Sequence, residues 1–211
     1  MNKYILLLAF LLPFTAFSQE SNLGNWLIYI GSKKLDNKWN IHHEVQYRNY
    51  NAIGDLEQLL LRTGVGKNLT DGNNNLLLGY GFIRSENYTN EEDKIVINEH
   101  RIFQQFITKQ SIGKLGIQHR YRFEQRFVED DFKLRFRYFL GISYPLTDQF
   151  YLSSYNEIFL NTVQNAFDRH RLYGGLGYKL SDRIKIELGY MNQFLINTNR
   201  DQINVLGFFN F

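Results

Sequence analysis

The sequence predicts an all-β fold, an antiparallel up-and-down transmembrane β-barrel of about ten to twelve strands. The clearest evidence is a hairpin at residues 115–144, in which side chains alternate between two faces with the period of a β-strand. One face carries apolar and aromatic side chains, and the other carries mostly basic ones. A soluble sandwich would bury the apolar face, whereas a membrane barrel would present it to lipid and keep the charges inside.

The composition also favours a barrel. The chain of 211 residues has no cysteine and only two prolines, but 18 phenylalanines and 14 tyrosines. Aromatic residues favour strands, and a closed ladder of backbone hydrogen bonds needs no disulfides. After the first 18 residues, no apolar run approaches the length of a membrane-spanning helix. The net charge of +3 is mild, so we expect no nucleic-acid partner.

Residues 1–18 have the features of a secretory signal peptide. A short start with one positive charge, Lys3, is followed by an apolar run that continues to Phe17. Small residues, Ala16 and Ser18, precede the expected cleavage site, and polar residues follow it. The sequence therefore predicts that residues 19–211 form a single exported β-barrel domain.

The first half of this domain divides into strands separated by turn signals. We expect strands at residues 25–34, 39–50, 57–69, 75–88 and 94–108. The first carries Trp26, Ile28 and Ile30 on one face. The fifth alternates least regularly, and we assign Glu99 and Arg101 to its inner face.

The second half continues the same alternation. We expect strands at residues 115–127, 132–144, 150–160, 169–180, 184–196 and 202–211. The total is eleven, although bacterial single-chain outer-membrane barrels have even numbers. Two explanations are open: a short additional strand near residues 20–24, or a first strand at residues 25–34 that lies apart from the wall.

The connections between these strands alternate in character. Tight, turn-like connections are expected at residues 35–38, 70–74, 109–113, 145–149 and 180–183. Polar and generally looser connections are expected at residues 51–55, 89–93, 128–131, 161–168 and 197–201. Outer-membrane barrels have short periplasmic turns and longer outer loops, so the tight set is expected to face the periplasm.

Several segments carry a resemblance to known proteins. The chain ends in Phe211 with Phe209 on the same face, which resembles the terminal aromatic signature that the barrel-assembly machinery recognises. Further segments, at residues 99–104, 119–126, 134–138, 155–160 and 169–178, occur in order with Trp26 near the mature start. Together they resemble the domain-of-unknown-function 2490 family of bacterial outer-membrane barrels.

This resemblance implies a location in the outer membrane of a Gram-negative bacterium, in contact with outer-membrane lipids and lipopolysaccharide. It covers nearly the whole mature chain. The family has no established activity, so the resemblance implies no catalytic residues and no cofactor.

The alternation predicts a lumen lined by charged side chains, with basic residues in excess. The main members of this cluster are Glu44, Arg62, Glu99, Arg101, Arg120, Arg122, Glu124, Arg126, Arg135, Arg137, Glu157, Arg169 and Arg171. Buried charges must be paired, so one interpretation is a packed ionic lumen inside a structural barrel. The other is a narrow, porin-like channel for a small anionic solute, because rings of arginine and lysine favour anions.

Two other functions remain open. A lipid-modifying outer-membrane enzyme would need a nucleophile and a base, and the candidates are Ser153 with Glu157, or His42 with Glu44. No nucleophile elbow is present, and His42 with Glu44 would be only half of a metal site. We therefore expect no catalytic, cofactor or metal site. A secreted, soluble, lipocalin-like barrel is the other alternative.

Overall fold

The computed structural model describes residues 23–211, except for residues 53, 70–72, 91 and 163–164. The signal peptide predicted at residues 1–18 lies outside this range and stays a prediction. The described chain contains no helix that is long and apolar enough to cross a membrane.

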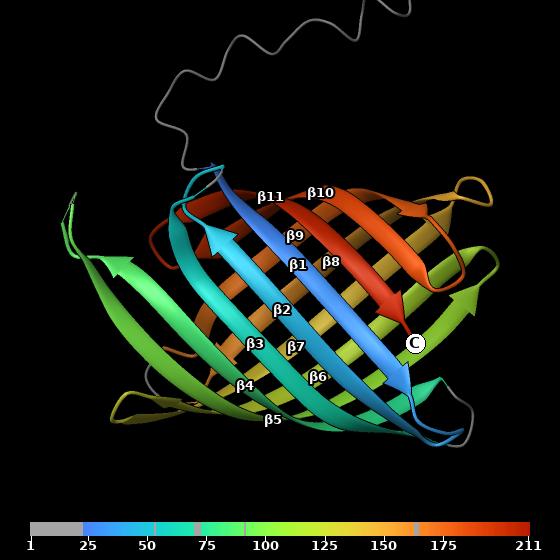
Figure 1. Cartoon of the computed structure of the whole chain (residues 1–211), viewed down its shortest axis with the longest axis horizontal. Helices are drawn as coiled ribbons and strands as arrows, with labels where there is room; N and C mark the ends of the chain where they lie inside the picture. Colours follow the sequence, from blue (N-terminus) through green and yellow to red (C-terminus); the bar gives the residue numbers. More distant parts are fainter. Residues whose placement is uncertain (1–22, 53, 70–72, 91, 163–164) are drawn as a thin grey trace, which may run out of the picture.

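The described residues form one closed β-barrel (Figure 1). Its strands are β1 (Leu23–Lys34), β2 (Trp39–Asn49), β3 (Leu56–Asn68), β4 (Asn74–Tyr88), β5 (Lys94–Ile112), β6 (Leu115–Val128), β7 (Asp131–Pro145), β8 (Phe150–Asn161), β9 (Phe167–Lys179), β10 (Ile184–Leu195) and β11 (Asn199–Asn210). The predicted all-β, up-and-down barrel fold is confirmed.

The barrel closes through a parallel pair. Each strand is antiparallel to the next, but β1 pairs with β11 in parallel, from Leu23 opposite Asp201 to Ser32 opposite Asn210. In a meander with an odd number of strands, the first and last strands run in the same direction, so closure must be parallel. The second explanation for the odd count is wrong, because residues 25–34 lie in the wall. Of the segment named in the first explanation, Leu23 and Gly24 begin that same strand, and residues 20–22 lie outside the described residues.

The odd count also separates the two ends of the described chain. Leu23 lies at one end of the barrel, which we call the loop end, together with the connections after β2, β4, β6, β8 and β10. Asn210 lies at the opposite end, the turn end, together with the connections after β1, β3, β5, β7 and β9.

Local hydrogen bonds explain the first turn. The Asp36 carboxylate accepts hydrogen bonds from the backbone N–H groups of Lys38, at 2.6 Å, and Trp39, at 2.7 Å. These two donors hold the pKa of Asp36 below its ordinary value, because they stabilise the charged carboxylate. The Asp36 side chain thereby accepts hydrogen bonds from two backbone N–H groups of the turn.

Several connections differ from the prediction. The last, expected at residues 197–201, is shorter, because residues 199–201 belong to β11 and pair with β10. Residues 109–112 were expected to form a turn, but they extend β5 and pair with the start of β6. Gly113, with φ of 59°, supplies the left-handed conformation of the short turn that remains. Residues 128–131 were expected to form a looser loop, but only Glu129 and Asp130 separate β6 from β7.

The alternation of side chains sorts the barrel wall into two faces. Glutamate, glutamine and arginine side chains dominate the buried inner positions, and large apolar side chains such as Leu78 and Leu188 are exposed on the outer face. A small apolar cluster also lies inside, formed by Trp26, Ile28, Tyr173, Met191 and Leu206. This distribution is inverted relative to a soluble barrel, whose apolar side chains would fill the interior.

Candidate functional site

The strand register places every member of the predicted charge cluster on the inner face. Ten of them are buried: Glu44, Arg62, Glu99, Arg101, Arg122, Glu124, Arg135, Arg137, Glu157 and Arg171. Three are half-buried, Arg120, Arg126 and Arg169. The cluster therefore gathers side chains from β2, β3, β5, β6, β7, β8 and β9 into one lumen.

Glu124 is the centre of the largest ionic network. It lies opposite Arg135 in the pairing of β6 with β7, and Arg135 donates to its carboxylate at 2.6 Å. Arg137, two residues further along the same face of β7, donates to the other carboxylate oxygen at 2.8 Å. Arg135 also donates to Asp168 at 2.9 Å. One fully buried carboxylate is thus shared by two arginines.

Glu157 extends this network across the lumen. Arg137 donates to Glu157 at 2.6 Å, and Arg120 donates to the same oxygen at 2.8 Å. Arg171 lies opposite Glu157 in the pairing of β8 with β9, with 3.9 Å between their charged atoms. The ionic network is therefore continuous from β6 to β9.

Two smaller ionic groups join β5 with β6 and β2 with β3. Glu99 accepts hydrogen bonds from Arg101, at 2.5 Å, and from Arg126, at 2.6 Å. Glu44 accepts from Arg62 at 2.9 Å and from Gln46. Each buried carboxylate of the predicted cluster thus has at least one arginine partner.

Aromatic side chains balance the excess of arginine, and the sequence prediction missed them. Four guanidinium groups lie within 6.0 Å of the Phe159 ring centroid, those of Arg135, Arg137, Arg169 and Arg171. The negative face of an aromatic ring attracts a cation, and more strongly where water is excluded. The signal was present in the sequence, because Phe159 shares the face of Glu157.

Trp26 has the same role at the edge of the apolar cluster. The guanidinium of Arg48 lies 3.7 Å from its ring centroid, and that of Arg171 lies 4.8 Å away. Arg122 lies over Phe103 at 4.6 Å in the same way. Phe103, Arg122, Glu124 and Phe159 are each at most 2% exposed. The lumen is therefore packed with side chains at this level.

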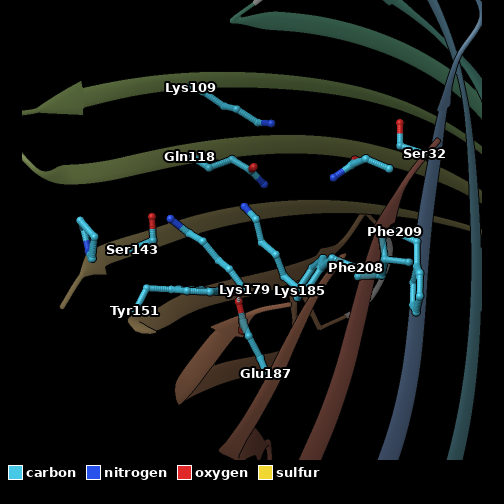
Figure 2. Close-up of a pocket in the computed structure, with 13 residues that line it drawn as sticks. Ser32, Lys109, Gln118, Ser143, Tyr151, Lys179, Lys185, Glu187, Phe208 and Phe209 are labelled. Atoms are coloured by element: carbon cyan, nitrogen blue, oxygen red, sulfur yellow. Dashed lines mark hydrogen bonds between the residues drawn. The ribbon is translucent and has the colours of Figure 1, made fainter. Parts of the chain in front are cut away.

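A cavity of about 470 Å³ opens at the turn end, and we call it the turn-end vestibule. It is lined by Ile30, Ser32, Lys109, Gln118, Ser143, Pro145, Tyr151, Lys179, Lys185, Glu187, Phe208, Phe209 and Asn210 (Figure 2). Ile30 and Phe208 also pack against the apolar cluster, which places that cluster at the inner limit of the vestibule.

The candidate enzyme residues do not assemble into a recognisable site. The Glu157 carboxylate is occupied by Arg120 and Arg137, and the described contacts include no hydrogen bond from Ser153 to it. His42 lies 3.3 Å from Glu44, whose other oxygen accepts from Arg62. No group of three or more potential metal ligands occurs among the described residues.

Outward histidines and the terminal phenylalanines pack on aromatic neighbours. His119 stacks on Tyr138, and His170 stacks on Phe194. His43 stacks on Phe211, which in turn stacks on Phe209. The predicted terminal aromatic residues thus lie on the outer face at the turn end, against the seam between β1 and β11.

Comparison with known proteins gives the family. The family described as protein of unknown function (DUF2490) matches residues 23–204, nearly the whole barrel. The chain belongs to this family. An uncharacterized protein of Methylorubrum extorquens is 33% identical over 164 residues, which cover 71% of this chain and 69% of that protein. No solved structure matches this DUF2490 chain significantly.

The network around Glu124 makes a prediction about stability. Glu124→Gln leaves Arg135 and Arg137 without the charge that they share, so we expect the free energy of unfolding to fall by about 3–5 kcal/mol. Asp131→Asn is the matched control, because the ion pair of Asp131 with Lys133 is exposed and is expected to contribute at most about 1 kcal/mol.

The measurement is urea unfolding of the two full-length variants and the parent protein in detergent micelles. Equal, small changes for Glu124→Gln and Asp131→Asn would contradict a structural role for the buried network.

Proposed function

We propose that this DUF2490 protein is an outer-membrane β-barrel of a Gram-negative bacterium. In this proposal the lumen is closed by the buried ion pairs around Glu124 and Glu157. The observation that carries the proposal is the inverted distribution of side chains. Charged residues such as Glu124 and Arg137 are buried inside, and leucines such as Leu78, Leu152 and Leu188 are exposed around the outside. Lipid is the solvent in which this arrangement has the lowest free energy.

Water is a poor alternative environment for this outer face. Exposed apolar surface costs about 25 cal/mol per Å² in water, and soluble monomers rarely expose patches above a few hundred Å². The exposed large apolar side chains come from ten of the eleven strands, β1 to β10, so the unfavourable surface would surround nearly the whole barrel. This argues against the soluble, lipocalin-like alternative, in which the lumen would be apolar.

The proposed orientation follows from the connections. In outer-membrane barrels the tight turns face the periplasm, and the turn end carries the connections that the sequence predicts to be tight, so we propose that the turn end and Phe211 face the periplasm. Because the strand number is odd, Leu23 then lies at the outer surface. Even numbers are the rule for bacterial single-chain barrels, and an odd number is known from the mitochondrial outer membrane.

The packed lumen favours a structural barrel over an open channel. The arginines that would select anions are held by Glu99, Glu124 and Glu157 or stacked on aromatic rings. A solute crossing at the level of Glu124 would have to break ion pairs from which water is excluded. In this proposal the protein is therefore a structural component of the membrane and conducts no steady ionic current.

Substituting arginine on the outer face tests the membrane location. Leu188, in the middle of β10, and Leu180, in a connection at the turn end, are similarly exposed, at 59% and 55%. We expect Leu188→Arg to block assembly, because arginine costs about 2–4 kcal/mol at the midplane of the bilayer and about 0–1 kcal/mol near its surface. Leu180→Arg is expected to assemble normally.

Assembly is measured by fractionating the host membranes and comparing unboiled with boiled samples on gels, in which a folded barrel migrates faster. Normal outer-membrane assembly of Leu188→Arg, or recovery of the parent protein only in a soluble fraction, would contradict the proposal.

Planar-bilayer recordings test the closed lumen separately. The reconstituted parent protein is expected to give no steady open-channel current, because its lumen is packed at the level of Phe103 and Phe159. Reproducible unitary currents that change on Arg137→Gln would instead support the narrow anion channel.

A further inference from the structure

The turn-end vestibule differs from the rest of the lumen in how its charges are arranged. Lys109 from β5, Lys179 from β9 and Lys185 from β10 direct their ammonium groups into the same space, together with the Gln118 amide of β6 (Figure 2). Elsewhere in the lumen, basic side chains are interleaved with carboxylates. The vestibule gathers positive charge around an open volume.

None of these three lysines forms an ion pair with a carboxylate among the described contacts. The lysines that form ion pairs in the described part of the chain are Lys94 and Lys133, which lie outside the vestibule. The one acidic residue in the lining, Glu187, accepts hydrogen bonds from the hydroxyl groups of Tyr151, at 2.9 Å, and Tyr173, at 3.2 Å. Each of its oxygens thus already accepts a tyrosine hydroxyl, and a single carboxylate cannot balance three ammonium groups.

The register adds a direct repulsion. Lys185 lies opposite Lys179 in the antiparallel pair of β9 and β10, on the inner face of both strands. Like charges directly opposite each other destabilise a sheet. On the facing side of the vestibule, Lys109 lies opposite Gln118 in the pairing of β5 with β6, which adds an uncharged donor. An anion between the two strand pairs would remove the repulsion.

The remaining lining indicates the chemical class of the ligand. The volume of about 470 Å³ falls within the range of small-molecule sites. Ile30, Pro145 and Phe208 give the vestibule an apolar wall, and the hydroxyl groups of Ser32 and Ser143 add hydrogen-bond partners. The apolar cluster behind Ile30 and Phe208 closes the inner end, so a ligand would enter and leave through the same mouth.

We propose that the turn-end vestibule binds a small organic phosphate, a phosphate monoester with two negative charges. Lysine is a common phosphate ligand, acting as a point charge. Three lysines attract a phosphate dianion more strongly than a carboxylate ligand, which carries only one negative charge. The apolar wall would take the organic part of the molecule. In the proposed orientation the mouth faces the periplasm, but binding itself does not depend on the membrane location.

The test is calorimetric titration of the full chain, folded in a neutral detergent, with phenyl phosphate at constant ionic strength. Dihexanoyl phosphatidic acid, titrated in parallel, distinguishes a lipid phosphate from a free phosphate monoester. Binding of phenyl phosphate supports a solute ligand, whereas binding of the short-chain lipid alone supports a lipid headgroup.

The variants are Lys179→Gln and Lys185→Gln, with Lys67→Gln as the matched control. Lys67 is exposed at the same end of the barrel but lies over Trp39 on the outer face. We expect each vestibule variant to weaken phosphate binding by about tenfold, because one positive charge within contact distance of the dianion is lost. Lys67→Gln is expected to bind as the parent protein does.

Thermal unfolding distinguishes phosphate binding by Lys179 and Lys185 from a contribution of these lysines to the stability of the barrel. Without phosphate, Lys179→Gln and Lys185→Gln are expected to unfold at the same temperature as the parent or higher, because a repulsion is removed. Phenyl phosphate should raise the unfolding temperature of the parent and of Lys67→Gln only. Absence of binding to the parent, or equal weakening in Lys67→Gln, would overturn the proposal.

Discussion

The buried carboxylate of Glu124, shared between Arg135 and Arg137, is the interaction on which the closed lumen depends. A charge in a water-free interior costs several kcal/mol unless it is paired and hydrogen-bonded, so the surrounding strands must hold these three side chains in one arrangement. The antiparallel register of β6 with β7 supplies that arrangement, and Glu157 on β8 continues it. The same alternation that directs these charges inward directs leucine and phenylalanine outward.

The excess of arginine over glutamate would be unfavourable if ion pairs were its only partners. Phe159, Trp26 and Phe103 resolve this, because each offers an aromatic face to one or more guanidinium groups. Arginine suits both kinds of contact, since its planar group can donate at its edge and stack on its face. Lysine lacks this planar group and would replace a stacked arginine poorly. Three lysines accordingly lie in the open vestibule at the turn end instead.

Alternation in the sequence was sufficient to count eleven strands, although the even numbers of bacterial barrels left the prediction at about ten to twelve. It also predicted the inner face of Glu44, Arg122 and Glu157, because a period of two leaves only one choice of face. It did not predict how the barrel closes. The parallel pairing of β1 with β11 depends on both chain ends meeting, which no local pattern records. The vestibule was missed for a similar reason, since nothing local to either strand shows that the register places Lys179 opposite Lys185.

The chain has two tryptophans, and they lie on opposite faces of the wall. Trp39 is 41% exposed on the outer face at the turn end, and Trp26 is 3% exposed between two arginines in the lumen. The most direct test of the inverted barrel is tryptophan fluorescence in vesicles of brominated lipid, with Trp26→Phe and Trp39→Phe variants isolating each signal. We expect the lipid to quench Trp39 and to leave Trp26 unchanged. Unquenched Trp39 in vesicles that contain the folded protein, or stronger quenching of Trp26, would contradict the lipid-facing outer wall.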